Sequence, residues 1–121
     1  MTHTQSPHRV TAVPGTQHVT VRIDGTLVAE TRRPLLVYET GLPVRVYITP
    51  DDVALDLLTP TETHTTCPFK GVASYWSFGG RQDVAWAYPE PLDAVAEIRD
   101  HLSFYDSAAE ITVAGDVPAQ P

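Results

Sequence analysis

Alternation of polar and apolar side chains runs through most of this 121-residue chain and constrains its fold more than any other feature. Residues 18–23, His-Val-Thr-Val-Arg-Ile, show it clearly, and Asp24-Gly25 then supplies a hairpin turn into residues 26–29. Successive side chains of a β-strand point to opposite faces, so this pattern is typical of strands that bury one face. The same alternation predicts further strands over residues 35–39, 44–48, 72–78, 83–88 and 111–113.

Two segments break the alternation and are expected to be helical. Thr49 followed by Pro50 resembles an N-cap with proline at the first helical position, which predicts a short helical turn through Leu57. Pro91 is expected to open the one main α-helix, which would end between residues 101 and 105. Apolar residues at helical spacing would form its buried face: Leu92, Val95, Ile98, Leu102 and Tyr105. The predicted fold class is therefore mainly β, with this helix and the short turn.

The ends of the chain lack periodicity. Residues 1–16 are rich in Thr, Pro and His and predict a flexible leader, and residues 117–121 predict a flexible tail. Residues 17–116 then make a single β-rich domain, the size that one hydrophobic core can support. The polar start of the chain has no apolar signal-peptide core, which indicates a cytoplasmic protein.

Composition excludes several classes of partner. The formal charge is -7, and no cluster of Lys and Arg is present to neutralise phosphates, so nucleic acid is not an expected partner. No apolar run approaches the roughly 20 residues that span a bilayer, so no membrane is expected either. A small organic molecule is the expected partner, and no oligomeric state is predicted.

The segment from Cys67 to Trp76 concentrates the scarcest side chains, with the only cysteine, the only lysine and one of two tryptophans. This concentration predicts a pocket. Cys67 is a candidate nucleophile if Lys70 or His64 lowers its pKa, or else a buried small hydrophobe. Lys70 would bind an anion, form a Schiff base or tune Cys67, or else lie on the surface before a turn. Tyr75 completes the catalytic candidates.

Aromatic side chains on the two neighbouring strands 72–78 and 83–88 are the main candidates for ligand binding. Tyr75 and Trp76 must point to opposite faces, whereas Trp86 and Tyr88 share one face. One face would line an aromatic pocket for a planar or cationic ligand, and the alternative is plain core packing.

Glu39 and Tyr47 flank the Gly41 turn and join the ligand-binding candidates. A carboxylate and a phenol beside Lys70 would suit acid–base chemistry. Alternatively, Glu39 pairs with Arg33 or Arg45.

No metal or cofactor is expected. A single cysteine cannot supply two Cys-x-x-Cys pairs, and His64, Cys67 and His101 offer at most three zinc ligands. The chain has no P-loop, and Asp51 and Asp52 are adjacent rather than spaced as carboxylates that hold Mg²⁺ for nucleotidyl transfer.

The segments Cys67-Pro68-Phe69-Lys70-Gly71 and Ala85-Trp86-Ala87-Tyr88-Pro89 resemble those of the bacterial and fungal family called domain of unknown function 427, also labelled nucleotidyltransferase-like. The resemblance covers about residues 17–116. It implies a small fold of two antiparallel sheets, similar to the β-tent or Mss4-like architecture.

Two functions stay open. The first is a small-molecule-binding domain that acts as a small metal-independent enzyme through the Cys67–Trp76 segment. The second is a non-catalytic ligand-binding or protein-interaction module with an aromatic pocket.

Overall fold

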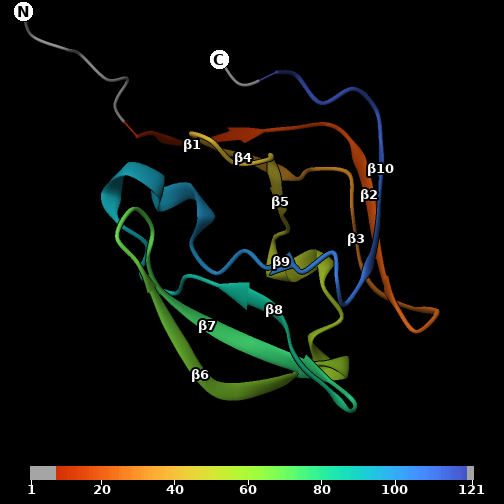
Figure 1. Cartoon of the computed structure of the whole chain (residues 1–121). Helices are drawn as coiled ribbons and strands as arrows, with labels where there is room; N and C mark the ends of the chain where they lie inside the picture. The colour runs from red at the N-terminus through yellow and green to blue at the C-terminus, as the bar shows by residue number, and fades with distance from the viewer. Residues whose placement is uncertain (1–7, 120–121) are drawn as a thin grey trace, which may run out of the picture.

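The computed structural model describes residues 8–119 and confirms a mainly β protein built from antiparallel sheets. Figure 1 shows three groups of strands around the middle of the molecule. The strands are β1 (Val10–Pro14), β2 (His18–Ile23), β3 (Thr26–Thr31), β4 (Leu35–Glu39), β5 (Arg45–Tyr47), β6 (Thr59–Cys67), β7 (Gly71–Phe78), β8 (Arg81–Ala87), β9 (Ser103–Phe104) and β10 (Glu110–Ala114). Three short 3-10 helices accompany them: η1 (Pro50–Asp52), η2 (Leu55–Leu57) and η3 (Asp93–Ile98).

The strands divide among three sheets, where the family resemblance implied two. Their orders are β1-β4-β5, β10-β2-β3 and β6-β7-β8-β9. The predicted turn at Asp24-Gly25 joins β2 to β3, and both residues have the positive φ that a tight hairpin needs. Gly79, also at positive φ, lies in the predicted turn between β7 and β8. Local turn chemistry therefore determined both hairpins.

Three strands lie outside the predicted set: β1, β6 and the two-residue β9, which falls on the expected helix. β1 pairs along its whole length with β4, so residues 10–14 are not part of a flexible leader. β6 pairs with β7 at the edge of its sheet and is mostly exposed, which explains why its sequence has no hydrophobic alternation. Its threonines are the only strand signal, because β-branched residues favour extended backbone. The rest of the expected leader, residues 1–7, and residues 120–121 of the expected tail lie outside the described range.

The prediction of one main α-helix from Pro91 to residues 101–105 is wrong. η3 is a short 3-10 helix, interrupted by non-helical dihedrals at Val95. Val95 and Ile98 are fully buried, and their three-residue spacing suits a 3-10 turn as well as an α-helix. Beyond them Asp100 takes a positive φ, and β9 pairs with β8 instead of continuing a helix. Pairing with a distant strand therefore overrode the local periodicity.

The short helical turn predicted over residues 49–57 is present as η1 and η2. Thr49 occupies the N-cap position of η1 and Pro50 the first helical position, as expected, although the Thr49 side chain makes no capping hydrogen bond.

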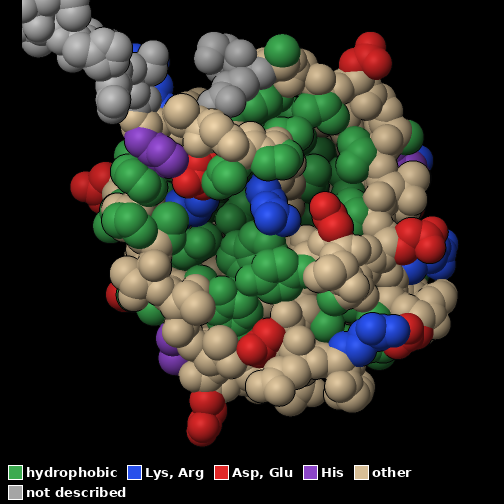
Figure 2. All heavy atoms as spheres, in the orientation of Figure 1, with side chains coloured by type: hydrophobic (Ala, Val, Ile, Leu, Met, Phe, Trp, Pro, Cys, Tyr) green, Lys and Arg blue, Asp and Glu red, His purple; other side chains and the backbone are tan. Residues whose placement is uncertain are grey.

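The hydrophobic core has two clusters that meet at β8. Val84, Ala85 and Ala87 belong to the first cluster, with residues of β2, β3 and β9. Trp86 and Tyr88 belong to the second, with Tyr47, Tyr75 and the buried residues of η3. Ala85 and Ala87 thus pack on the opposite side of the strand from Trp86. Figure 2 shows a hollow in the middle of the visible face, lined largely by hydrophobic side chains, with basic and acidic side chains near it.

No helix within residues 8–119 has both the length and the apolar character to cross a membrane.

Candidate functional site

A cavity of about 220 Å³ opens over the second core cluster, and we call it the phenol pocket. It lies between the end of β4, β5, the β6–β7 turn, β7 and β8. Its lining residues are Val37, Glu39, Leu42, Pro43, Arg45, Tyr47, Lys70, Tyr75, Trp86, Tyr88 and Tyr105. The sequence predicted eight site residues. The phenol pocket brings six of them together: Glu39, Tyr47, Lys70, Tyr75, Trp86 and Tyr88.

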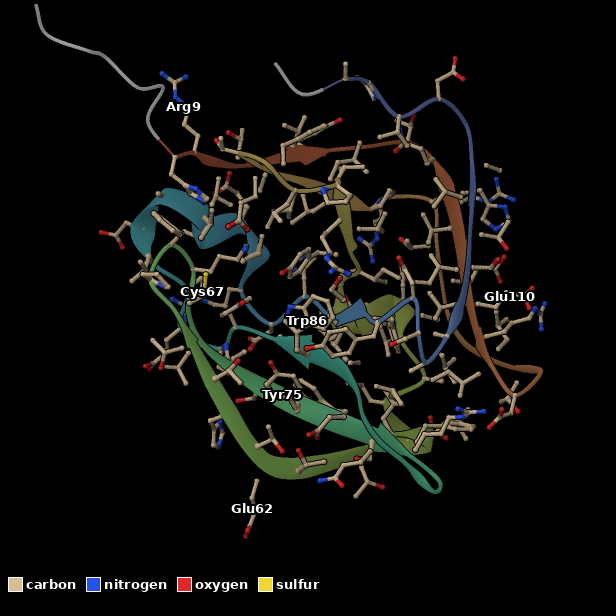
Figure 3. All side chains as sticks on the ribbon, viewed as in Figure 1. Arg9, Glu62, Cys67, Tyr75, Trp86 and Glu110 are labelled. Carbon is tan, nitrogen blue, oxygen red and sulfur yellow. The ribbon has the colours of Figure 1, made fainter. Side chains whose placement is uncertain are left out.

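Strand register aligns the aromatic side chains of the pocket. Tyr75 on β7 lies directly opposite Trp86 on β8, so the two rings share one face of the sheet. Tyr88 follows two residues after Trp86 and points the same way. Figure 3 shows Tyr75 and Trp86 extending from these strands toward the middle of the molecule.

Cys67 and Trp76 lie outside the pocket lining. Cys67, at the end of β6, is half-buried and packs against the second core cluster. Figure 3 shows it at the η3 end of β6. Trp76 packs against the first cluster, on the opposite face of β7 from Tyr75. The period-two expectation that Tyr75 and Trp76 diverge is confirmed.

Hydrogen bonds hold the aromatic rings in place. The Trp86 indole N–H donates to the Tyr47 hydroxyl at 3.1 Å, with the rings edge to face. The Tyr75 hydroxyl shares a 2.7 Å hydrogen bond with Thr65 and receives a longer one from Tyr105. Because Tyr47 accepts from Trp86, its own hydroxyl proton remains available to a ligand.

The phenols are neutral donors at physiological pH. Burial raises the pKa of Tyr47 to about 12, against weaker opposing effects of the Trp86 hydrogen bond and the Arg45 charge. Burial also raises the pKa of Tyr105 to about 12, and it raises the pKa of Tyr88 well above its ordinary value. The pocket therefore presents O–H groups that donate to an oxygen-bearing ligand and do not act as bases.

The positive charge of Lys70 in the pocket is balanced by the carboxylate of Glu39. Lys70 and Glu39 are only 8% and 9% exposed, and the Lys70 ammonium donates directly to Glu39. The second oxygen of Glu39 lies 3.0 Å from Nε2 of His8, whose ring stacks on Phe69. Burial acts to raise the pKa of Glu39, but the hydrogen bonds from Lys70 and His8 hold it below its ordinary value. The pair Glu39–Lys70 is thus an ion pair.

Glu39 does not pair with either arginine considered from the sequence. Arg33 instead approaches Asp52, at 3.3 Å. Arg45 has no ion pair among residues 8–119, and its guanidinium lies 5.2 Å from the centre of the Trp86 ring. Arg45 is therefore a cation with spare hydrogen-bond donors at the pocket wall.

Sequence reasoning missed three residues of this site: His8, Arg45 and Tyr105. A signal existed for Arg45, since it precedes Tyr47 by two residues on one strand, the spacing that marks a shared face. Tyr105 was placed on the expected helix, and the loop after β9 carries it to the pocket instead.

The three zinc ligands considered from the sequence do not come together. His64 lies 3.3 Å from the Ala73 carbonyl oxygen, and His101 contacts the Arg99 carbonyl. Across the described part of the chain, no three His, Cys, Asp or Glu side chains are grouped to hold a metal ion.

Comparison with known proteins assigns the chain to a family of small domains. Residues 11–115 match the model of the family described as domain of unknown function DUF427. The chain belongs to this family, which confirms the resemblance drawn from the Cys67–Gly71 and Ala85–Pro89 segments. The match begins inside β1 and ends just after β10. A search of curated proteins found no match.

Proposed function

We propose that this domain binds a small organic molecule in the phenol pocket without covalent chemistry. The observation that carries the proposal is the convergence on one aromatic cavity of neutral phenol hydroxyls and an arginine that has no ion pair among residues 8–119. Binding sites are typically concave and mainly apolar, with a few polar groups that orient the ligand. The single free cysteine fits the reducing cytoplasm, which we propose as its location. The net charge of -7 supports a partner other than nucleic acid.

The surroundings of the two candidate reactive residues, Lys70 and Cys67, favour binding over catalysis. The Lys70 side-chain nitrogen is already hydrogen-bonded to Glu39, so it is not free for a Schiff base. The Cys67 thiol is not part of the pocket lining. An enzyme that used either group would first have to separate Lys70 from Glu39 or bring Cys67 to the ligand.

Mass spectrometry of the protein under native conditions tests the proposal. A compound that co-purifies with the wild type is expected to be reduced in Tyr47→Phe, which loses a donor but keeps the ring. Tyr38→Phe is the matched control, because the Tyr38 hydroxyl donates to the Pro118 carbonyl outside the phenol pocket. Equal occupancy in wild type, Tyr47→Phe and Tyr38→Phe would contradict binding in this pocket.

The enzyme alternative has its own test. Stoichiometric reaction of Cys67 with a mild thiol reagent, or loss of turnover of the co-purified compound in Lys70→Arg, would favour it. We expect a slowly reacting thiol, and a Lys70→Arg protein that still binds the compound.

A further inference from the structure

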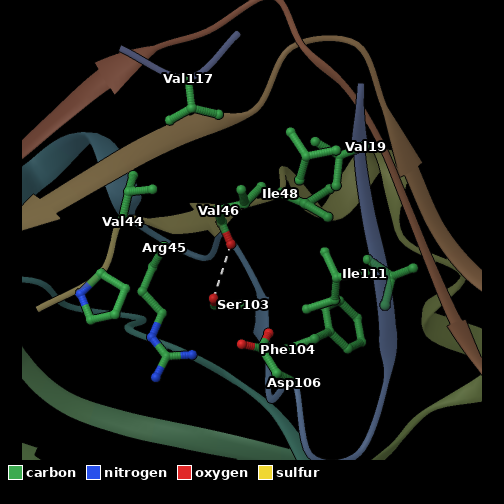
Figure 4. Close-up of a pocket in the computed structure, with 13 residues that line it drawn as sticks. Val19, Val44, Arg45, Val46, Ile48, Ser103, Phe104, Asp106, Ile111 and Val117 are labelled. Carbon is green, nitrogen blue, oxygen red and sulfur yellow. Dashed lines mark hydrogen bonds between the residues drawn. The ribbon is translucent and has the colours of Figure 1, made fainter. Parts of the chain in front are cut away.

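A second cavity, of about 320 Å³, lies next to the phenol pocket, and we call it the valine cavity. Its walls include Val19, Val21, Val46, Ile48, Ile111 and Val113. Figure 4 shows Val19, Val46, Ile48 and Ile111 facing one space between β2, β5 and β10. Ser103, a polar residue of the wall, already donates to the Val46 carbonyl at 2.9 Å. The valine cavity therefore suits an apolar occupant.

The two cavities adjoin at the start of β5. Pro43 and Arg45 line both of them. The chain after β9 forms the other shared border, because Phe104 faces the valine cavity and the next residue, Tyr105, faces the phenol pocket. A single ligand that occupied both spaces would pass Arg45.

Charge distinguishes the two ends of this combined space. At the phenol end, Lys70 is already paired with Glu39, which leaves Arg45 as the unpaired cation among the described lining residues. The Tyr88 hydroxyl also lines the phenol pocket and adds a donor beside that of Tyr47. Asp106 is an exposed carboxylate that lines the valine cavity and not the phenol pocket, and it disfavours an anion within the valine cavity. An anionic group is therefore stabilised at the phenol end.

We propose that the ligand is an organic acid with an extended apolar body, its carboxylate bound by Arg45 and the Tyr47 and Tyr88 hydroxyls and its body in the valine cavity. This assignment rests on the proposed function, because it requires that the phenol pocket bind a small molecule. A guanidinium and two neutral phenols supply N–H and O–H donors, which match the acceptor oxygens of a carboxylate. The apolar walls stabilise each buried methylene.

Calorimetric titration with hexanoate, octanoate and decanoate, and with 1-octanol and octylammonium, tests this assignment. Affinity is expected to rise about fourfold for each added methylene until the valine cavity is filled. Octanoate is expected to bind at least about tenfold more tightly than 1-octanol, and octylammonium more weakly than both. The indole N–H resonance of Trp86 should shift with octanoate, which places the head group in the phenol pocket.

Two variants test the binding of the ligand's carboxylate and of its apolar body separately. Arg45→Gln should weaken octanoate about tenfold or more and 1-octanol less than about twofold, and Arg22→Gln, on the exposed face of β2, should change neither. Val113→Phe narrows the valine cavity from a position that is 37% exposed, so the fold tolerates it. It should weaken decanoate several-fold more than hexanoate.

Equal affinity for octanoate and 1-octanol, or an unchanged octanoate affinity in Arg45→Gln, would overturn the assignment. So would binding that is independent of chain length and of Val113→Phe. In these cases a co-purified compound that depends on Tyr47 would leave the proposed function intact. Failure of every probe to bind also overturns the assignment, and absence of a Tyr47-dependent compound then removes the proposed function as well.

Discussion

Glu39 and Lys70 form a buried ion pair that lines the pocket and also contributes to the stability of the fold. Removal of one partner leaves the other charge buried, so Glu39→Gln should lower the free energy of unfolding by about 3–5 kcal/mol at pH 7. Because its pKa is lowered in the folded state, Glu39 contributes stability above its ordinary pKa, and this contribution is lost as pH falls through the lowered value.

The difference in the free energy of unfolding between wild type and Glu39→Gln should therefore become smaller at acidic pH. Urea denaturation at pH 7 and pH 3 measures it. Asp24→Asn is the control, because Asp24 pairs with Arg81 at an exposed site and should cost less at pH 7. A difference between wild type and Glu39→Gln that is independent of pH would show that the pair is not ionised.

The phenols of the pocket make a second prediction at the residue scale. An absorbance titration at about 295 nm should show part of the tyrosine ionisation delayed beyond pH 10, because burial raises the pKa of Tyr47 and Tyr105 to about 12. A neutral form that is favoured only in the folded state contributes stability below pH 10, which is lost as pH rises through 12. Tyr47→Phe should remove part of the delayed step. Ionisation of every tyrosine near pH 10 in the folded protein would contradict this.

At the scale of the element, the turn between β6 and β7 depends on one glycine. Gly71 has φ near +120°, and a Cβ there would lie 3.1 Å from the Glu90 carbonyl oxygen. Gly71→Ala should therefore destabilise the protein by about 1–3 kcal/mol in urea denaturation. Gly80→Ala is the matched control, since no atom lies within 4 Å of its Cβ position. Equal stability of the two variants would show that the chain beside Glu90 yields to the added methyl group.

At the scale of the whole molecule, β8 ties the two core clusters together. Trp76 packs against the first cluster and Trp86 belongs to the second, so the single-tryptophan variants Trp86→Phe and Trp76→Phe report on different parts of the core. Within each variant, fluorescence and far-ultraviolet circular dichroism should give the same denaturation midpoint, because loss of β8 removes both clusters. Separate midpoints would show that the clusters unfold independently.

Much of the element order could be predicted from local sequence. The alternation around Asp24-Gly25 and Gly79 predicted hairpins because turn residues and side-chain period act over only a few residues. β1 and β6 escaped prediction because both are edge strands, stabilised by pairing with a distant or neighbouring strand rather than by a buried alternating face. The prediction of an α-helix after Pro91 was wrong for a related reason, since the apolar residues of this segment pack in two different core clusters.

The sequence by itself determined the β-rich class, the family and most of the aromatic residues of the pocket, because these depend on residue identity, spacing and strand period. Only the tertiary structure decided which partner each side chain meets. It paired Lys70 with Glu39, left Cys67 and Trp76 outside the pocket and set Arg45 between two cavities. These outcomes depend on contacts between residues far apart in the chain, and no local pattern specifies them.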